Sequence, residues 1–150
     1  MKNKSLPRLF LITIALAALA SLGCKKKPDA PIADVNLGAT ISGIIKVAPE
    51  LTAQARESHT LYIIARKDSG PPLAVKRITD PQFPYAFIIS GDDAMFPGTP
   101  FQGEVRLIAR IDKDGNAGPA QSGDLEGTAT KNPARVGDRD VDVTIDKAIP

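Results

Sequence analysis

The single histidine and the single cysteine of this 150-residue chain limit the chemistry that it can perform. A histidine-dependent catalytic triad would have to use His59, yet no nucleophile stands in a sharp glycine-flanked turn that would expose it. A blue copper site combines two histidines with a cysteine and often a methionine, and here only His59 and Met95 remain for that role. Covalent haem attachment needs two cysteines followed by a histidine, and the sequence lacks that pattern.

One acidic segment has the opening spacing of a calcium-binding loop. Asp112, Asp114 and Asn116 occupy the first, third and fifth positions. The sixth position is Ala117 where such a loop has glycine, and the twelfth is Gly123 where it has glutamate. We therefore interpret this segment as a solvated acidic turn and predict no metal site.

Two further groups of charged residues have both a structural and a functional interpretation. Asp92 and Asp93 could pair as acid and base, but adjacent acids in a loop are usually exposed, and no neighbour is expected to shift a pKa. Arg66 and Arg110 are both expected on the outer face of strands. There they would form weak surface ion pairs or receive the carboxylates of a partner protein. We predict no catalytic residue, no cofactor and no enzymatic activity.

Short apolar runs alternate with polar residues through most of the chain, which predicts β-strands. We therefore expect strands and the turns between them to position the charged residues described above. From Val105 to Asp112 the alternation has the two-residue period of a strand with one buried face, and Asp114-Gly115 then ends the run as a turn would. Gly43 marks a possible bulge. A helical turn is expected only within residues 49–58, and residues 91–102 form a longer surface loop. We predict strands at residues 40–47, 60–67, 73–78, 82–90, 104–112, 124–130 and 139–146.

This pattern favours one all-β domain over residues 37–150. Short strands with frequent turn signals are typical of an antiparallel β-sandwich, here of about seven strands, and a small closed barrel is the competing architecture. The composition is 43% hydrophobic with five Phe, two Tyr and no Trp, which predicts an aliphatic core.

The first 23 residues have the features of a lipoprotein signal peptide. A basic start is followed by an apolar run from Leu9 to Ala20, which is shorter than the roughly 20 residues that span a bilayer. The segment Ser21-Leu22-Gly23-Cys24 resembles a bacterial lipobox, so we predict acylation of Cys24 as the new N-terminus. Residues 24–36, with the acylated cysteine and Pro, Ala and charged residues, form a flexible tether.

Acyl chains on Cys24 would bind the protein to membrane lipid, since each buried CH₂ contributes about 0.8 kcal/mol. We expect a lipid-anchored protein of the cell envelope, placed on the outer membrane and facing the periplasm in a bacterium with two membranes. The formal charge of +2 depends on the leader: without Lys2, Lys4 and Arg8, the 19 basic residues fall to 16 against 17 acidic ones. The composition therefore gives no case for nucleic-acid binding.

Five ordered pieces of sequence carry a family resemblance. They are ISGIIKVAPEL, LYIIARKDSGPPLAVKR, DDAMFPG, VRLIARIDKDGNA and GDLEG. Together they resemble the C-terminal Ig-like domain of the cytochrome c-type biogenesis protein CycH, also called CcmI, over Ile41 to Asp146. The resemblance implies an Ig-like β-sandwich. The candidate partner-binding or motif residues that fall in these pieces are Arg66, Pro71, Pro72, Asp93, Met95, Arg110, Gly115, Gly123 and Asp124.

The resemblance also implies a role. Full-length members of this family resemble membrane proteins with a helical-repeat region that holds apocytochrome c for haem ligation, whereas here we expect only a leader, a tether and the β domain. We expect a non-catalytic, protein-binding envelope lipoprotein in c-type cytochrome maturation, whose partners are apocytochrome c or maturation proteins. A structural or carbohydrate-binding β-sandwich is the alternative, and a copper carrier using His59 and Met95 is a weaker one.

Overall fold

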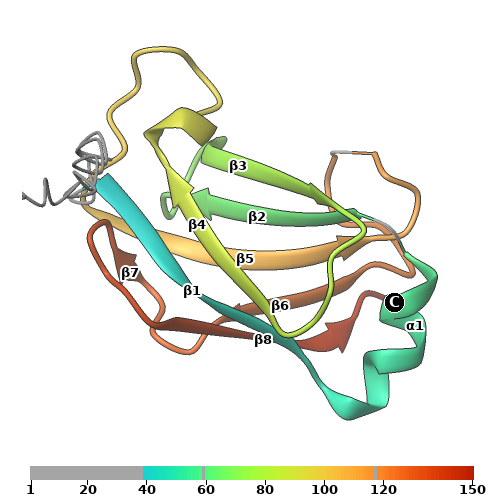
Figure 1. The fold of residues 1–150 in the computed structure, drawn as a ribbon. Coiled ribbons are helices and arrows are strands. Elements are labelled where there is room, and N and C mark those ends of the chain that lie inside the picture. Colours follow the sequence, from blue (N-terminus) through green and yellow to red (C-terminus); the bar gives the residue numbers. More distant parts are fainter. Residues whose placement is uncertain (1–38, 59, 117) are drawn as a thin grey trace, which may run out of the picture. The chain divides into compact units, whose positions relative to one another are not determined.

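The computed structural model describes residues 39–58, 60–116 and 118–150 (Figure 1). The expected signal peptide (1–23), Cys24, the tether (24–36) and His59 lie outside the described residues. No helix within the described part of the chain is long and apolar enough to cross a membrane.

Every predicted strand is present, and a short eighth strand is added. The elements are β1 (Thr40–Val47), η2 (Pro49–Leu51), α1 (Thr52–Glu57), β2 (Thr60–Arg66), β3 (Pro72–Thr79), β4 (Tyr85–Ser90), η3 (Gly91–Asp93), β5 (Glu104–Asp112), β6 (Leu125–Ala129), β7 (Ala134–Arg135) and β8 (Val141–Ala148). The helical turn expected within residues 49–58 is confirmed by η2 and α1. Strand β4 begins three residues later than predicted, directly after Pro84, which has no N–H to donate to a strand pairing.

The strands follow one another in the order β3-β2-β5-β6-β8-β1-β4, with β7 paired to the side of β5. The two end strands of this order come together where Ala74 of β3 bridges Ala94 and where the Met95 N–H donates to the Leu73 carbonyl at 3.0 Å. The fold is therefore an all-β Ig-like sandwich whose sheet is nearly closed (Figure 1).

The predicted antiparallel sandwich has one parallel pairing. Strands β1 and β8 run parallel, with Gly43 opposite Val141 and Val47 opposite Ile145. A hairpin forces its two strands to be antiparallel, but β1 and β8 are the first and last strands, so no tight turn sets their direction. Every other pairing among the named strands is antiparallel.

The core is aliphatic, as predicted from the composition. In β8, Val141, Val143 and Ile145 are buried while the residues between them are exposed, as the alternation predicted. The facing layer contributes fully buried residues such as Leu107 and Ile63. The loops at both ends of the sheet are therefore connected to strands that are packed into this core.

Gly43 does not form the bulge that was predicted for it. The pairing of β1 with β4 continues through Gly43 without a shift, and the pairing of β1 with β8 begins at Gly43. A Cβ on Gly43 would overlap the backbone of Val141, and one on Gly127 would overlap that of Thr144. Glycine is thus required on both sides of β8, because the neighbouring backbones approach closely there. The irregularities in pairing lie at Ala65/Arg66 and at Glu126/Gly127.

Candidate functional site

The predicted motif residues gather at the two opposite ends of β2 and β5. These strands are antiparallel, with Thr60 opposite Asp112 at one end and Arg66 opposite Arg106 at the other. Arg110, Gly115, Gly123 and Asp124 belong to the first end. Arg66, Pro71, Pro72, Asp93 and Met95 lie on the elements toward the second end, around β3 and η3. The structure therefore does not bring all nine residues into one site.

At the first end, Arg110 is buried, so the prediction of a surface-exposed arginine on the outer face is wrong in its exposure but not in its face. Only 6% of the residue is exposed. The guanidinium Nε lies 4.0 Å from Asp112 Oδ2 and 3.9 Å from Asp124 Oδ2, and Nη2 donates to the Gly118 carbonyl at 2.6 Å. The last four residues of β5 are all buried. Arg110 does leave the sheet on the outer side of β5, but the following loop folds back and covers it.

The two carboxylates of this cluster hold residues 113–123, which we call the β5–β6 loop. Asp112 Oδ1 accepts the Gly115 N–H at 2.6 Å. Asp124 accepts the Lys113 N–H at 3.1 Å and the Gln121 N–H at 2.9 Å, and so fixes both ends of the loop. The interpretation of this segment as a solvated turn is therefore wrong for Asp112, which is 2% exposed.

Two further observations define the chemistry of the loop. The Tyr62 hydroxyl, which the sequence did not indicate, donates to the Gly115 carbonyl at 3.1 Å. Asp114 is exposed as predicted, and its carboxylate accepts the Asn116 N–H at 3.0 Å, which forms a local turn. Gly115 and Gly123 both have positive φ values, of 78° and 95°, which glycine adopts without strain.

The pKa values follow from these contacts. Burial raises the pKa of Asp112 above its ordinary value; the Gly115 N–H opposes this shift, while the charge of Asp124 adds to it. The pKa of Asp114 is lowered, chiefly by the hydrogen bond from the Asn116 backbone. Because the carboxylates of the cluster already bind backbone N–H groups, the cluster acts as a structural clamp on the loop. Across residues 39–58, 60–116 and 118–150, no group of three or more His, Cys, Asp or Glu side chains is placed to hold a metal ion.

At the second end, Arg66 stabilises the turn between β2 and β3. Its Nη2 donates to the Gly70 carbonyl at 3.2 Å, and Gly70 has a φ of 91°. Pro71 and Pro72 then lead into β3, where Pro72 starts the strand. These residues form a turn of defined shape.

Asp93 and Met95 lie at η3 and just after it. Asp93 accepts the Ser90 N–H at 2.9 Å and forms an ion pair with Lys76 at 3.2 Å, so this carboxylate is held in a helix cap. Met95 is 49% exposed and is fixed through its backbone to Leu73. Among these predicted residues, Met95 is the one that offers a large apolar side chain to solvent.

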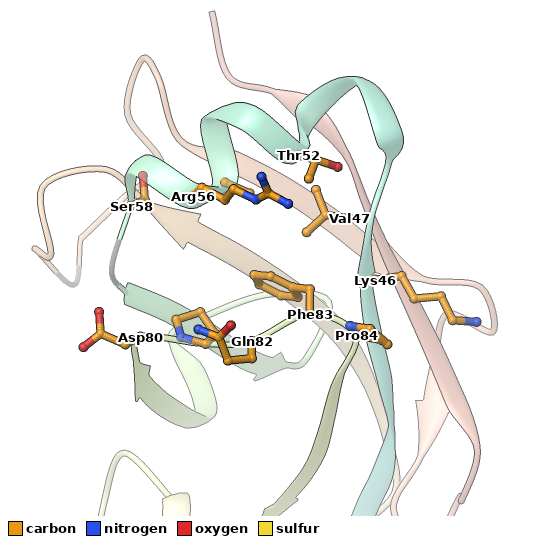
Figure 2. A pocket seen from close by; sticks show the side chains of 11 residues that line it. Lys46, Val47, Thr52, Arg56, Ser58, Asp80, Gln82, Phe83 and Pro84 are labelled. Carbon is orange, nitrogen blue, oxygen red and sulfur yellow. The ribbon is translucent and has the colours of Figure 1, made fainter.

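A concavity beside α1 contains none of the predicted residues. We call it the α1 pocket; it has a volume of about 710 Å³ and lies between α1 and residues 80–84 (Figure 2). Figure 2 shows the Phe83 ring projecting toward α1 and the Arg56 side chain extending from α1 over the same space. It is lined by Lys46, Val47, Thr52, Ala55, Arg56, Ser58, Asp80, Pro81, Gln82, Phe83 and Pro84.

The α1 pocket has charged residues of both signs at its rim, Arg56, Lys46 and Asp80, and an apolar floor. Arg56 is exposed and makes no ion pair or side-chain hydrogen bond with any residue that the structure describes. Lys46 pairs with Asp142 at 3.2 Å, but both side chains are about half exposed, at 52% and 49%. The carboxylate of Asp80 points away from Phe83 in Figure 2. No local motif marks these residues, since they come from separate segments of the chain.

Comparisons with known proteins agree with the fold. A family model described as the cytochrome c-type biogenesis protein H Ig-like domain matches residues 41–146. The cytochrome c-type biogenesis protein CycH of Pseudomonas aeruginosa is 34% identical over 94 residues, which cover 60% of this chain and 23% of that protein. An uncharacterized protein of Aquifex aeolicus is 34% identical over 109 residues, 71% of this chain and 70% of its own length.

This chain thus spans under a quarter of the length of its Pseudomonas relative. No solved structure matches it. The family model nevertheless covers well over half of the sequence, including every strand from β1 to most of β8. The chain therefore belongs to the cytochrome c-type biogenesis protein H Ig-like domain family.

Proposed function

We propose that this protein is a membrane-anchored, non-catalytic module of the bacterial cell envelope that binds a protein partner during c-type cytochrome maturation. The observation that carries the proposal is the family match over residues 41–146. Its partners would be apocytochrome c or the proteins that ligate haem to it.

The side-chain chemistry supports binding over catalysis. The most deeply buried charged residues, Arg110, Asp112 and Asp124, hold the β5–β6 loop. Asp92 and Asp93 do not act as an acid–base pair in this arrangement, because the Asp93 carboxylate caps η3 and binds Lys76. These side chains fix the shape of their loops, which suits a recognition surface.

Anchoring belongs to the same proposal and is supported by the sequence. The lipobox-like segment before Cys24 favours acylation of that cysteine, and residues 24–36 would let the domain move away from the bilayer. In a bacterium with two membranes, the domain would face the periplasm from the outer membrane.

Affinity capture tests the proposal. The full chain with a C-terminal tag is expressed in its native organism, and detergent-solubilised membranes are passed over an affinity resin. An unrelated tagged lipoprotein of similar size serves as the control bait. We expect haem-ligation proteins or apocytochromes to be enriched over the control. Equal recovery of these proteins with both baits would contradict a role in maturation.

A further inference from the structure

We propose that the α1 pocket binds an acidic, apolar segment of a polypeptide, with a carboxylate at Arg56 and an apolar side chain against Phe83. This inference rests on the proposed function, because it gives the chemistry of the protein partner.

The charge of the rim is the first argument. Arg56 is an exposed guanidinium with no ionic partner among residues 39–58, 60–116 and 118–150. A guanidinium binds a carboxylate through two parallel N–H···O bonds, which makes it a specific receptor for that group. Lys46 also lines the pocket, but its side chain extends away from Arg56 in Figure 2 and pairs with Asp142. Arg56 is therefore the cation that an incoming carboxylate meets.

The apolar floor is the second argument. The Phe83 ring packs partly against the core and its remaining surface faces the pocket, beside Val47 and Pro84 (Figure 2). Ala55 closes the floor and is buried. A volume of about 710 Å³ lies within the range of natural ligand sites. The ligand therefore carries an apolar group next to its carboxylate.

The remaining polar groups favour a polypeptide. Ser58 and Gln82 stand at the rim, and neither side chain makes a hydrogen bond with a described residue. A hydroxyl and an amide together supply donors and acceptors, which match the alternating N–H and C=O groups of an extended peptide. A segment that alternates acidic and aliphatic residues satisfies all three features of the α1 pocket.

Fluorescence anisotropy with a defined probe tests this inference. The probe is a fluorescein-labelled ten-residue peptide that alternates Leu and Glu, and a second peptide replaces every Glu with Gln. Both are titrated with the purified full chain in detergent micelles, as wild type, Arg56→Ala and Arg77→Ala. Arg77 is a matched control because it is an exposed arginine on β3, outside the pocket, with no ionic partner among the described residues.

We expect the acidic peptide to bind the wild type, and Arg56→Ala to weaken binding about tenfold, as the loss of a charge-assisted hydrogen bond predicts. Arg77→Ala should bind like the wild type, and the Gln peptide should bind weakly to all three. In ¹H–¹⁵N spectra, the amides of residues 46–47, 55–58 and 80–84 should shift. Equal binding by Arg56→Ala and the wild type, or shifts confined to other residues, would overturn the inference.

The two proposals fail separately. If Arg56→Ala loses the peptide but the wild-type bait captures no maturation protein, the pocket chemistry holds and the proposed function is wrong. If the bait captures maturation proteins and Arg56→Ala captures them equally, the function holds and the pocket is not the docking site.

Discussion

Replacing Arg110 with methionine probes the buried cluster that holds the β5–β6 loop. Methionine has a similar length and fits an apolar site, so the change removes the charge and the hydrogen bonds with little change in volume. It leaves Asp112 and Asp124 facing each other, 2% exposed each, without the guanidinium that lies 4.0 Å and 3.9 Å from them. It also leaves the Gly118 carbonyl without its donor.

The expected loss of unfolding free energy at neutral pH is about 3 to 5 kcal/mol, because breaking a buried ion pair leaves uncompensated charge. The hydrogen bond to Gly118 alone accounts for about 1.5 to 3 kcal/mol of this, since its donor is charged. The Nε atom of Arg110 has no hydrogen-bond partner. The ion pairs at 3.9–4.0 Å are therefore purely electrostatic, which places the expected loss toward the lower end.

The loss should depend on pH in a defined direction. A carboxyl with a raised folded-state pKa stabilises the fold below its unfolded pKa, and that contribution disappears as the pH rises through the folded pKa. Asp112 is such a group in the wild type, because burial raises its pKa. Removing the positive charge of Arg110 raises this pKa further. The loss of unfolding free energy in Arg110→Met should therefore be larger at pH 7 than at pH 4.5.

Urea unfolding followed by circular dichroism measures both effects. Arg106→Met is the matched control on the same strand, because Arg106 binds Asp68 at 2.9 Å with both side chains exposed. It should cost less than about 1 kcal/mol. A loss for Arg110→Met no larger than that of the control, or one that grows toward acid pH, would refute the reasoning.

Three other substitutions, and a fourth that serves as a control, test separate features of the protein. Gly43→Ala should lower the unfolding free energy by at least about 2 kcal/mol in the same urea assay, because its Cβ would overlap the β8 backbone. Gly118→Ala, whose Cβ meets no atom within 4 Å, should change it little, and equal effects would contradict the close approach. Tyr62→Phe should cost about 1 kcal/mol through the lost hydrogen bond to the β5–β6 loop, and should speed amide exchange there. Cys24→Ser should move the protein from the membrane to the soluble fraction on immunoblots of fractionated cells; unchanged membrane recovery would contradict acylation.

The strands were predictable from the sequence because each carries its own signal. In β8 the alternation of Val and Ile with Asp and Thr predicts one buried face whatever the rest of the chain does. The parallel pairing of β1 with β8 was not predictable, because it joins segments about 100 residues apart and no turn residue determines it. The glycine at position 43 interrupts an apolar strand pattern, but a bulge and a close backbone approach have the same sequence signal.

The candidate sites were less predictable, because they depend on how loops fold onto the sheet. Arg110 occupies an outward position of its strand, and only the return of the β5–β6 loop buries it. The α1 pocket combines Lys46, Arg56 and Phe83 from three segments, none of which has a motif of its own. Family resemblance indicated the residues that shape the turns, and it did not indicate the pocket.

The measurement that tests the central claim most directly is the content of c-type cytochromes in cells that lack this gene. Membrane proteins are separated by gel electrophoresis and stained for covalently bound haem, in the deletion strain and in the same strain complemented with the full chain. If the protein binds partners during cytochrome maturation, the haem-stained bands should be lost in the deletion strain and should return in the complemented strain. Normal bands in the deletion strain under conditions where the gene is expressed would contradict it.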